Sequence, residues 1–123
     1  VEPLPLTLDY RAMLAEPRLE IWLDGAAARP SAALILEPRA DALWIESLAV
    51  DPAAQGAGLG NALLDFAERR ARALDLAALR LCTGAPLTHL ADWYARRGFA
   101  VEREERLADR SLVHMVRALD PGR

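Results

Sequence analysis

Apolar residues recur with two different periods in the middle of the chain, and these periods predict a strand followed by a helix. Residues 43–50 form an apolar-rich run of strand length. Residues 59–74 carry apolar side chains every three or four positions, which is the period of an amphipathic helix. The side chains expected to face the core from this helix are Leu59, Leu63, Phe66, Ala67, Ala71 and Leu74. The two segments therefore predict a helix packed on a sheet.

The same patterns, read between glycine and proline breaks, predict the other elements. The expected strands are residues 19–23, 33–36, 43–50, 78–83, 99–107 and 112–119, and the expected helices are residues 6–15, 59–74 and 88–97. Residues 43–50 and 78–83 should be parallel, because a helix connects them. Gly98 is expected to end the second long helix. This order predicts an α/β (α+β) fold with a mixed sheet and flanking helices.

Strict alternation along residues 43–50 assigns its side chains to two faces. On this pattern Trp44, Glu46, Leu48 and Val50 face one way, and Leu43, Ile45, Ser47 and Ala49 face the other.

Composition limits the classes of function that need to be considered. A chain of 123 residues with 53% hydrophobic residues forms one domain with a real core. Its net charge of −3 argues against nucleic-acid binding. No apolar run reaches the roughly 18–20 residues of a membrane span, so no membrane association is expected. The single cysteine rules out an intrachain disulfide, and a cytoplasmic location is expected.

The strongest chemical signal is the glycine-rich loop, residues 55–60, which joins the strand to the helix. Its sequence is Gln55-Gly56-Ala57-Gly58-Leu59-Gly60. Backbone N–H groups at a helix start bind anions, and glycine lets a phosphate approach the backbone. The chain has no lysine, so this is not a Walker loop. Both frames of the dinucleotide fingerprint also fail, because Asn61 or Leu63 stands at the last glycine position.

The motif Gln-x-x-Gly-x-Gly, preceded by Leu48-Ala49-Val50-Asp51-Pro52, resembles the pyrophosphate loop of the GCN5-related N-acetyltransferases (GNAT). A second segment, Ala91-Asp92-Trp93-Tyr94-Ala95-Arg96-Arg97-Gly98-Phe99, is also similar to that family. The resemblance covers roughly residues 19–119 and implies a GNAT-like, mostly antiparallel sheet. The family has a further strand and usually two helices at its N-terminus. Residues 1–18 are too few for these, so a short N-terminal remnant of a single domain spanning residues 1–123 is expected.

The resemblance implies acetyl-CoA as cosubstrate, no metal, and direct transfer of the acetyl group to a primary amine in a ternary complex. The residues that it assigns to cosubstrate binding are Leu48, Ala49, Val50, Gln55, Gly56, Ala57, Gly58, Leu59, Gly60, Asn61 and Thr88. It implies that Tyr94 protonates the departing thiolate, and Glu46 is the candidate base for the amine. The acceptor is a small-molecule, peptide or protein amine, and a homodimer is possible. The first alternative is a non-catalytic acyl-CoA-binding or regulatory module on the same fold, and the second is an interaction domain that binds no CoA.

Other chemically active residues have structural interpretations. His89 is expected on the surface near a helix start, and His114 within the last strand is expected to be structural. Cys82 is expected to be buried packing in mid-sheet, which disfavours a covalent acetyl-cysteine route. Trp22, Trp44 and Trp93 are expected to line the core or a pocket.

Overall fold

The computed structural model describes residues 6–26, 29–56, 58–85 and 88–120. The strands are β1 (Thr7–Leu8), β2 (Glu20–Ala26), β3 (Arg29–Pro38), β4 (Ala42–Val50), β5 (Ala78–Ala85), β6 (Ala100–Arg106) and β7 (Ser111–Ala118). The helices are α1 (Tyr10–Ala15), the short 3₁₀ turn η1 (Pro52–Ala54), α2 (Leu59–Ala73) and α3 (Thr88–Ala95). Apart from η1 and the two residues of β1, each of these elements was expected from the sequence pattern.

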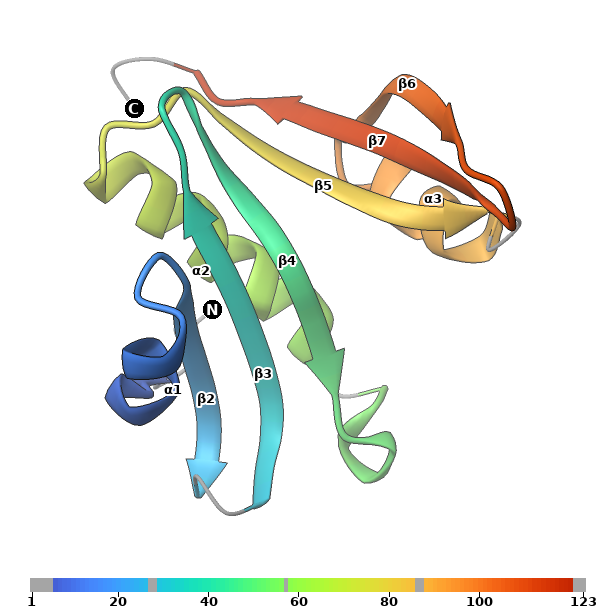
Figure 1. Cartoon of the computed structure of the whole chain (residues 1–123). Coiled ribbons are helices and arrows are strands. Elements are labelled where there is room, and N and C mark those ends of the chain that lie inside the picture. Colours follow the sequence, from blue (N-terminus) through green and yellow to red (C-terminus); the bar gives the residue numbers. More distant parts are fainter. Residues whose placement is uncertain (1–5, 27–28, 57, 86–87, 121–123) are drawn as a thin grey trace.

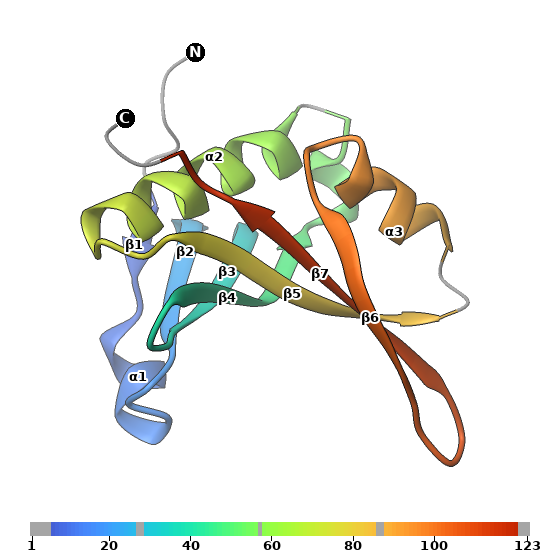
Figure 2. The same ribbon diagram turned by 90° about the horizontal axis from the view of Figure 1, so that it is seen from above.

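The strands form one sheet in the order β1-β2-β3-β4-β5-β7-β6 (Figure 1). All neighbouring pairs are antiparallel except β4 and β5, which are parallel and joined through α2. Figure 2 shows α2 and α3 on one face of the sheet and α1 on the other. The face opposite α2 is called the open face below. The expected mixed, mostly antiparallel α/β fold is confirmed.

The core lies between α2 and the middle strands. Its largest fully buried side chains are Leu34, Leu36, Leu43, Leu63, Leu79 and Met115. Of the helix residues expected to be buried, Leu63, Ala67 and Ala71 are buried, while Leu59, Phe66 and Leu74 are partly buried and pack against the core. The 3.6-residue period therefore located the buried face of α2 correctly.

Strands β4 and β5 separate partway along their length. They pair only from Ala42 with Ala78 to Ile45 with Leu81. Beyond that point β4 continues beside β3 to Val50, and β5 continues beside β7 (Figure 1). We call this divergence the fork. At the fork the two parallel strands are splayed apart.

A β-bulge in β4 overturns the alternation expected for this strand. Ser47 pairs with Ile35 while Ile45 pairs with Leu36, so Glu46 has no partner in the β3–β4 register. A bulge inserts one extra residue and changes which face the following side chains occupy. Leu48 therefore packs with Ile45 against the core, instead of sharing a face with Glu46. The predicted grouping of Glu46 with Leu48 and Val50 is wrong.

The first helix is shorter than residues 6–15, the range expected from the pattern. Thr7 and Leu8 pair with β2, and Asp9 then caps the helix by accepting from the Arg11 and Ala12 N–H groups at 3.1 and 3.3 Å. An N-cap residue has extended backbone geometry, so the helix begins after it. Tyr10 and Leu14 of α1 are both largely exposed.

Candidate functional site

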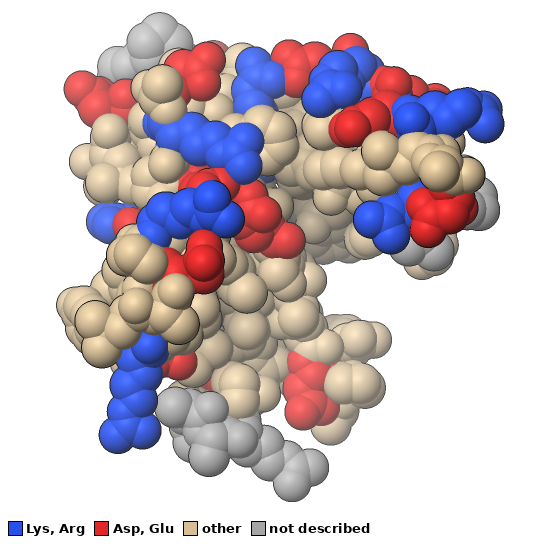
Figure 3. Space-filling view, in the orientation of Figure 1, with Lys and Arg blue, Asp and Glu red and all other residues tan. Residues whose placement is uncertain are grey.

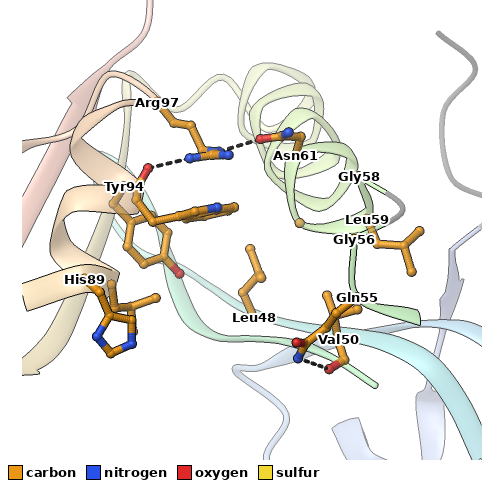
Figure 4. Close-up of a pocket in the computed structure, with 13 residues that line it drawn as sticks. Leu48, Val50, Gln55, Gly56, Gly58, Leu59, Asn61, His89, Tyr94 and Arg97 are labelled. Carbon is orange, nitrogen blue, oxygen red and sulfur yellow. Dashed lines mark hydrogen bonds between the residues drawn. The ribbon is translucent and has the colours of Figure 1, made fainter. Parts of the chain in front are cut away.

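A pocket of about 670 Å³ opens between the glycine-rich loop, the end of β4 and α3 (Figure 4). It is lined by Leu48, Val50, Gln55, Gly56, Gly58, Leu59, Gly60, Asn61, His89, Leu90, Trp93, Tyr94 and Arg97. We call it the loop pocket. The structure thus brings most of the residues predicted for cosubstrate binding together with Tyr94.

Local hydrogen bonds and two left-handed backbone positions give the glycine-rich loop its shape. Asp51 accepts from the Ala53 N–H at 2.8 Å and starts η1, and the Gln55 side-chain amide donates to the Val50 carbonyl at 3.3 Å. Gly56 and Gly58 have φ values of +89° and +79°, in the left-handed region that favours glycine. The turn therefore favours glycine at both positions, although among the described residues no atom crowds either one.

Gly58 is also the N-cap of α2, and it leaves the positive end of the helix available. Among the described residues no side chain caps this end, and the first turn of α2 contains no acidic residue. The first N–H groups of a helix have no partner within it, and the helix dipole favours an anion there. Since Gly58, Leu59 and Gly60 line the pocket, its lining can bind a phosphate-like group without a basic residue in the loop.

Gly60 has a different reason to be glycine. A Cβ at this position would lie 2.9 Å from the Trp93 ring, which is closer than real contacts allow. The indole of α3 therefore packs directly on the first turn of α2. This contact fixes the distance between the two helices that flank the pocket.

Beyond the fork, β4 has a strand neighbour only on its β3 side in the part of the chain that the structure describes. Leu48 and Val50 line the pocket from this stretch, whereas Ala49 is exposed and does not line it. A ligand with amide groups could pair with the free edge of β4 as an added strand would. Ala49 could take part only through its backbone.

Tyr94 is the titratable residue buried in this pocket. Its side chain is packed edge-on against Trp93 and Phe99, with ring centroids 5.0 and 5.4 Å apart. Burial raises the pKa of Tyr94 above its ordinary value. Figure 4 shows the hydroxyl end of the ring pointing into the pocket on the side of Leu48. The residue is placed to hold a proton beside the end of the β4 edge.

Glu46, the predicted base, does not line the loop pocket. It lies at the bulge and lines a pocket of about 400 Å³ with Arg39, Trp44, Ile45, Cys82, Arg103 and His114. We call this second cavity the open-face pocket. The Glu46 carboxylate is 37% exposed and lies 3.7 Å from the Arg39 guanidinium. Glu46 and Tyr94 therefore lie in two different pockets, with the fork between them.

Two other residues of the open-face pocket differ from expectation. The prediction of a buried cysteine is wrong, because Cys82 is exposed. Cys82 comes directly after the buried Leu81 in β5, so its side chain points to the opposite, open face of the sheet. Partial burial and the nearby Glu105 carboxylate raise the pKa of its thiol, which does not favour the nucleophilic thiolate form. His114, expected to be structural, is buried, with Nε2 2.9 Å from Glu105 and 3.8 Å from the Cys82 sulfur.

Some predicted residues lie beyond what the structure describes. Ala57 is outside the described residues, and so is the side chain of Thr88, whose backbone begins α3. Sequence reasoning did not identify Arg97 as a pocket residue. Its spacing could have done so, since the helix expected over residues 88–97 puts Arg97 one turn after Trp93. In the structure α3 ends at Ala95, and Arg97 lies in the turn that follows it. His89 is exposed as expected and also lines the pocket.

Two further properties bear on the class of protein. Among the described residues, no group of three or more His, Cys, Asp or Glu side chains is placed to hold a metal ion. Within the same part of the chain, no helix combines the length and apolar character that crossing a membrane requires.

The model of the Acetyltransferase (GNAT) family matches residues 4–99. The chain belongs to this family. Its fold is similar to that of a GNAT family acetyltransferase from Elizabethkingia anophelis with acetyl-CoA bound, with a TM-score of 0.77 and 16% identity over 90% of this chain and 83% of that one. The ribosomal-protein-S18-alanine N-acetyltransferase from Escherichia coli gives a TM-score of 0.74 and 20% identity over 94% of this chain and 79% of that one.

An acetyltransferase from Bacillus subtilis in complex with CoA is similar at a TM-score of 0.73, with 20% identity over 92% of this GNAT chain and 87% of that protein. At these identities the similarity establishes the fold, and the family match establishes the acetyltransferase class. The predicted family, fold and enzyme class are confirmed.

Proposed function

We propose that this GNAT protein is an acetyl-CoA-dependent N-acetyltransferase that transfers an acetyl group directly to a primary amine in a ternary complex. The observation that carries the proposal is the uncapped start of α2, shaped by left-handed glycines and opening onto a pocket beside the fork. Acetyl-CoA or CoA is bound in two of the proteins of similar fold. A third acts on an alanine of a ribosomal protein, which supports an amine acceptor.

In this proposal the pyrophosphate of acetyl-CoA binds the backbone N–H groups of the glycine-rich loop and the first turn of α2. The pantetheine arm lies along the free edge of β4 at Leu48 and Val50 and forms amide hydrogen bonds there. The thioester then reaches the fork, with Tyr94 beside its sulfur. Backbone N–H groups near Leu48 and Ala49 would polarise the thioester carbonyl.

The amine approaches the fork from the open face, where Glu46 lies. Figure 3 shows this face with acidic and basic side chains interspersed. Glu46 takes a proton from the ammonium, directly or through water, and the free amine attacks the carbonyl carbon. The new C–N bond forms as the C–S bond breaks, and the thiolate takes a proton from Tyr94. The amide nitrogen then loses its second proton to water, which returns it to Tyr94, and Glu46 releases its proton to solvent.

The test is to purify the protein natively, measure its mass with any bound ligand, and then supply acetyl-CoA with a panel of primary amines. We expect bound CoA or acetyl-CoA, and release of free thiol in the presence of an accepted amine. Binding of acetyl-CoA without turnover on any amine, including peptide N-termini, would favour the regulatory-module alternative. Absence of any CoA binding would overturn the proposal.

A further inference from the structure

Arg97 is the lining residue of the loop pocket that carries a permanent charge, as far as the described residues show. The other side chains that line the pocket are apolar, amide, hydroxyl or imidazole groups. The cosubstrate proposed above carries several negative charges on its pyrophosphate and its ribose phosphate. Apart from the positive end of α2, the electrostatic match between pocket and ligand therefore depends on this one guanidinium.

The guanidinium of Arg97 is held in place by neutral groups. Its plane lies over the Trp93 ring, with Cζ 3.8 Å from the centroid. One terminal nitrogen, Nη1, donates to the Trp93 carbonyl at 2.8 Å, and Nε donates to Asn61 Oδ1 (Figure 4). These contacts fix the orientation of the guanidinium and leave Nη2 without a partner among the described residues.

No described carboxylate neutralises Arg97, which distinguishes it from structural arginines of this chain. Arg70 binds both oxygens of Glu20, and Arg117 binds Glu68 at 2.6 Å. An ordered cation with neutral partners at the rim of a pocket favours an anionic ligand. The missing countercharge is the observation that points to a ligand.

We infer that Arg97 recognises the phosphate monoester on the ribose of acetyl-CoA, with Trp93 and Asn61 as the residues that position it. The inference rests on the proposed function and adds to it the selection of the cosubstrate's nucleotide end. The pyrophosphate already has the backbone N–H groups of the glycine-rich loop. A phosphate monoester carries about −1.5 to −2 charge and three acceptor oxygens, which a guanidinium binds well.

The donors already available to each phosphate favour the monoester over the pyrophosphate. Asn61, the anchor of Arg97, lies in the first turn of α2, whose backbone N–H groups serve the pyrophosphate in the proposal above. The loop itself contributes only the neutral Gln55 side chain, which is bonded to Val50. The phosphate that lacks a backbone site therefore has Arg97 as its charged partner.

The experiment measures the dissociation constants of CoA and 3′-dephospho-CoA by calorimetry for the wild type, Arg97→Gln and Arg96→Gln. Arg96 is the matched control, because it is the adjacent arginine, is exposed and does not line the pocket. Charge-assisted hydrogen bonds to phosphate imply that Arg97→Gln weakens CoA binding on the order of 10- to 100-fold. It should leave 3′-dephospho-CoA binding almost unchanged, and Arg96→Gln should alter neither.

A second variant tests the positioning role. Asn61→Ala removes the acceptor for Arg97 Nε, so it should reduce the preference for CoA over 3′-dephospho-CoA by a smaller factor, with an unchanged thermal melt. Equal losses for both nucleotides in Arg97→Gln would assign Arg97 to the pyrophosphate and overturn the inference. Unchanged CoA binding in Arg97→Gln would overturn it as well. A wild type that binds neither nucleotide would instead overturn the proposed function on which the inference rests.

Discussion

The chemistry proposed for Tyr94 follows from the surroundings of one side chain. Only 7% of the residue is exposed, and aromatic rings pack on it from two sides. Removal from water disfavours the phenolate, so the pKa rises above the ordinary value near 10. The hydroxyl therefore keeps its proton through the neutral range. A general acid needs this property, since it must be protonated when the thiolate leaves.

Tyr94→Phe keeps the ring and its packing and removes only the proton donor. We expect kcat to fall on the order of 10²–10⁴-fold, with acetyl-CoA affinity nearly unchanged, because the lost interaction acts mainly in the transition state. The pH profile gives a second readout. Activity needs the protonated phenol, so the wild-type rate should decline only as the pH rises through the raised pKa of Tyr94. This decline should be absent in Tyr94→Phe.

Rates measured by thiol release, together with calorimetry for binding, decide this prediction. Tyr10→Phe is the matched control, since Tyr10 is 70% exposed on α1 and outside the loop pocket. If Tyr94→Phe turned over its amine at the wild-type rate, the residue would only pack beside Phe99.

For single residues, the sequence indicated which residues belong to the candidate site better than it indicated the contacts around them. Gly56 and Gly58 could be predicted as a tight turn from their spacing, because left-handed φ restricts which residues can occupy it. Tyr94 could be placed from the resemblance of residues 91–99 to the family. The role of Arg97 depends on Asn61, thirty-six positions earlier in the chain. Contacts of this kind between distant segments do not leave a periodic signal, so sequence reading could not place them.

Among the elements, α2 and its preceding loop determine the proposed anion site. Gly58→Asp would introduce a carboxylate at the N-cap of α2, where the pyrophosphate is expected to bind. Asp tolerates left-handed φ better than most residues, so the fold should be retained. We expect a loss of CoA affinity of at least tenfold by calorimetry, because two anions would compete for the same helix end.

Gly58→Asn separates charge from shape in this test. Asn also adopts left-handed φ and has nearly the same size, but it is neutral. It should retain more CoA affinity than Gly58→Asp, while circular dichroism shows the same helix content for both variants. Equal affinity of the wild type and Gly58→Asp for CoA would contradict the placement of the pyrophosphate.

The helix is fixed to the sheet by an ion pair between α2 and β2. Arg70 donates to both oxygens of Glu20 at 2.9 and 2.7 Å, and the Glu20 side chain is only 11% exposed. Arg70→Met would leave this carboxylate buried without its charged partner. We expect the free energy of unfolding in urea to fall by about 3 kcal/mol. Arg69→Met is the control, because Arg69 is the exposed neighbour on the same helix.

The same pair makes the stability difference depend on pH. Burial alone would raise the pKa of Glu20, but the hydrogen bonds from Arg70 and Trp22 outweigh burial and lower it. A lowered folded-state pKa gives stability that is present above the unfolded value of about 4.3 and lost as the pH falls through the folded value. The wild type should therefore lose its advantage over Arg70→Met on acidification below about pH 4. A constant difference would show that the pair adds nothing electrostatic.

The bulge in β4 shows why the strand could be predicted and its faces could not. An apolar run of strand length indicates a strand whichever face each side chain occupies. Glu46 lies outside the pairing register because β3 and β4 shift relative to each other after Ile35. Sequence alternation contains no information about such a shift between two strands. The wrong face assignment affected the surroundings expected for Glu46, whereas the prediction that these residues form a strand was correct.

For the molecule as a whole, the proposed reaction depends on a sheet that separates two pockets and opens between them at the fork. The loop pocket lies on the side of α2 and α3, and the open-face pocket contains Glu46, Trp44 and His114. Each substrate would have its own face. Binding variants of the loop pocket, such as Gly58→Asp, should therefore lower acetyl-CoA affinity, whereas variants of the open-face pocket should leave that affinity unchanged.

Glu46→Gln tests this separation, because it keeps the shape of the side chain and removes the proposed base. We expect kcat with the amine to fall on the order of 10²–10⁴-fold while acetyl-CoA affinity, measured by calorimetry, stays unchanged. The defect should shrink as the pH rises, since a larger fraction of the amine is then unprotonated without help. Glu104→Gln is the control, because Glu104 is exposed on β6 and outside both pockets. A loss of acetyl-CoA affinity in Glu46→Gln would show that the two faces are not independent, and an unchanged kcat would show that another group or water deprotonates the amine.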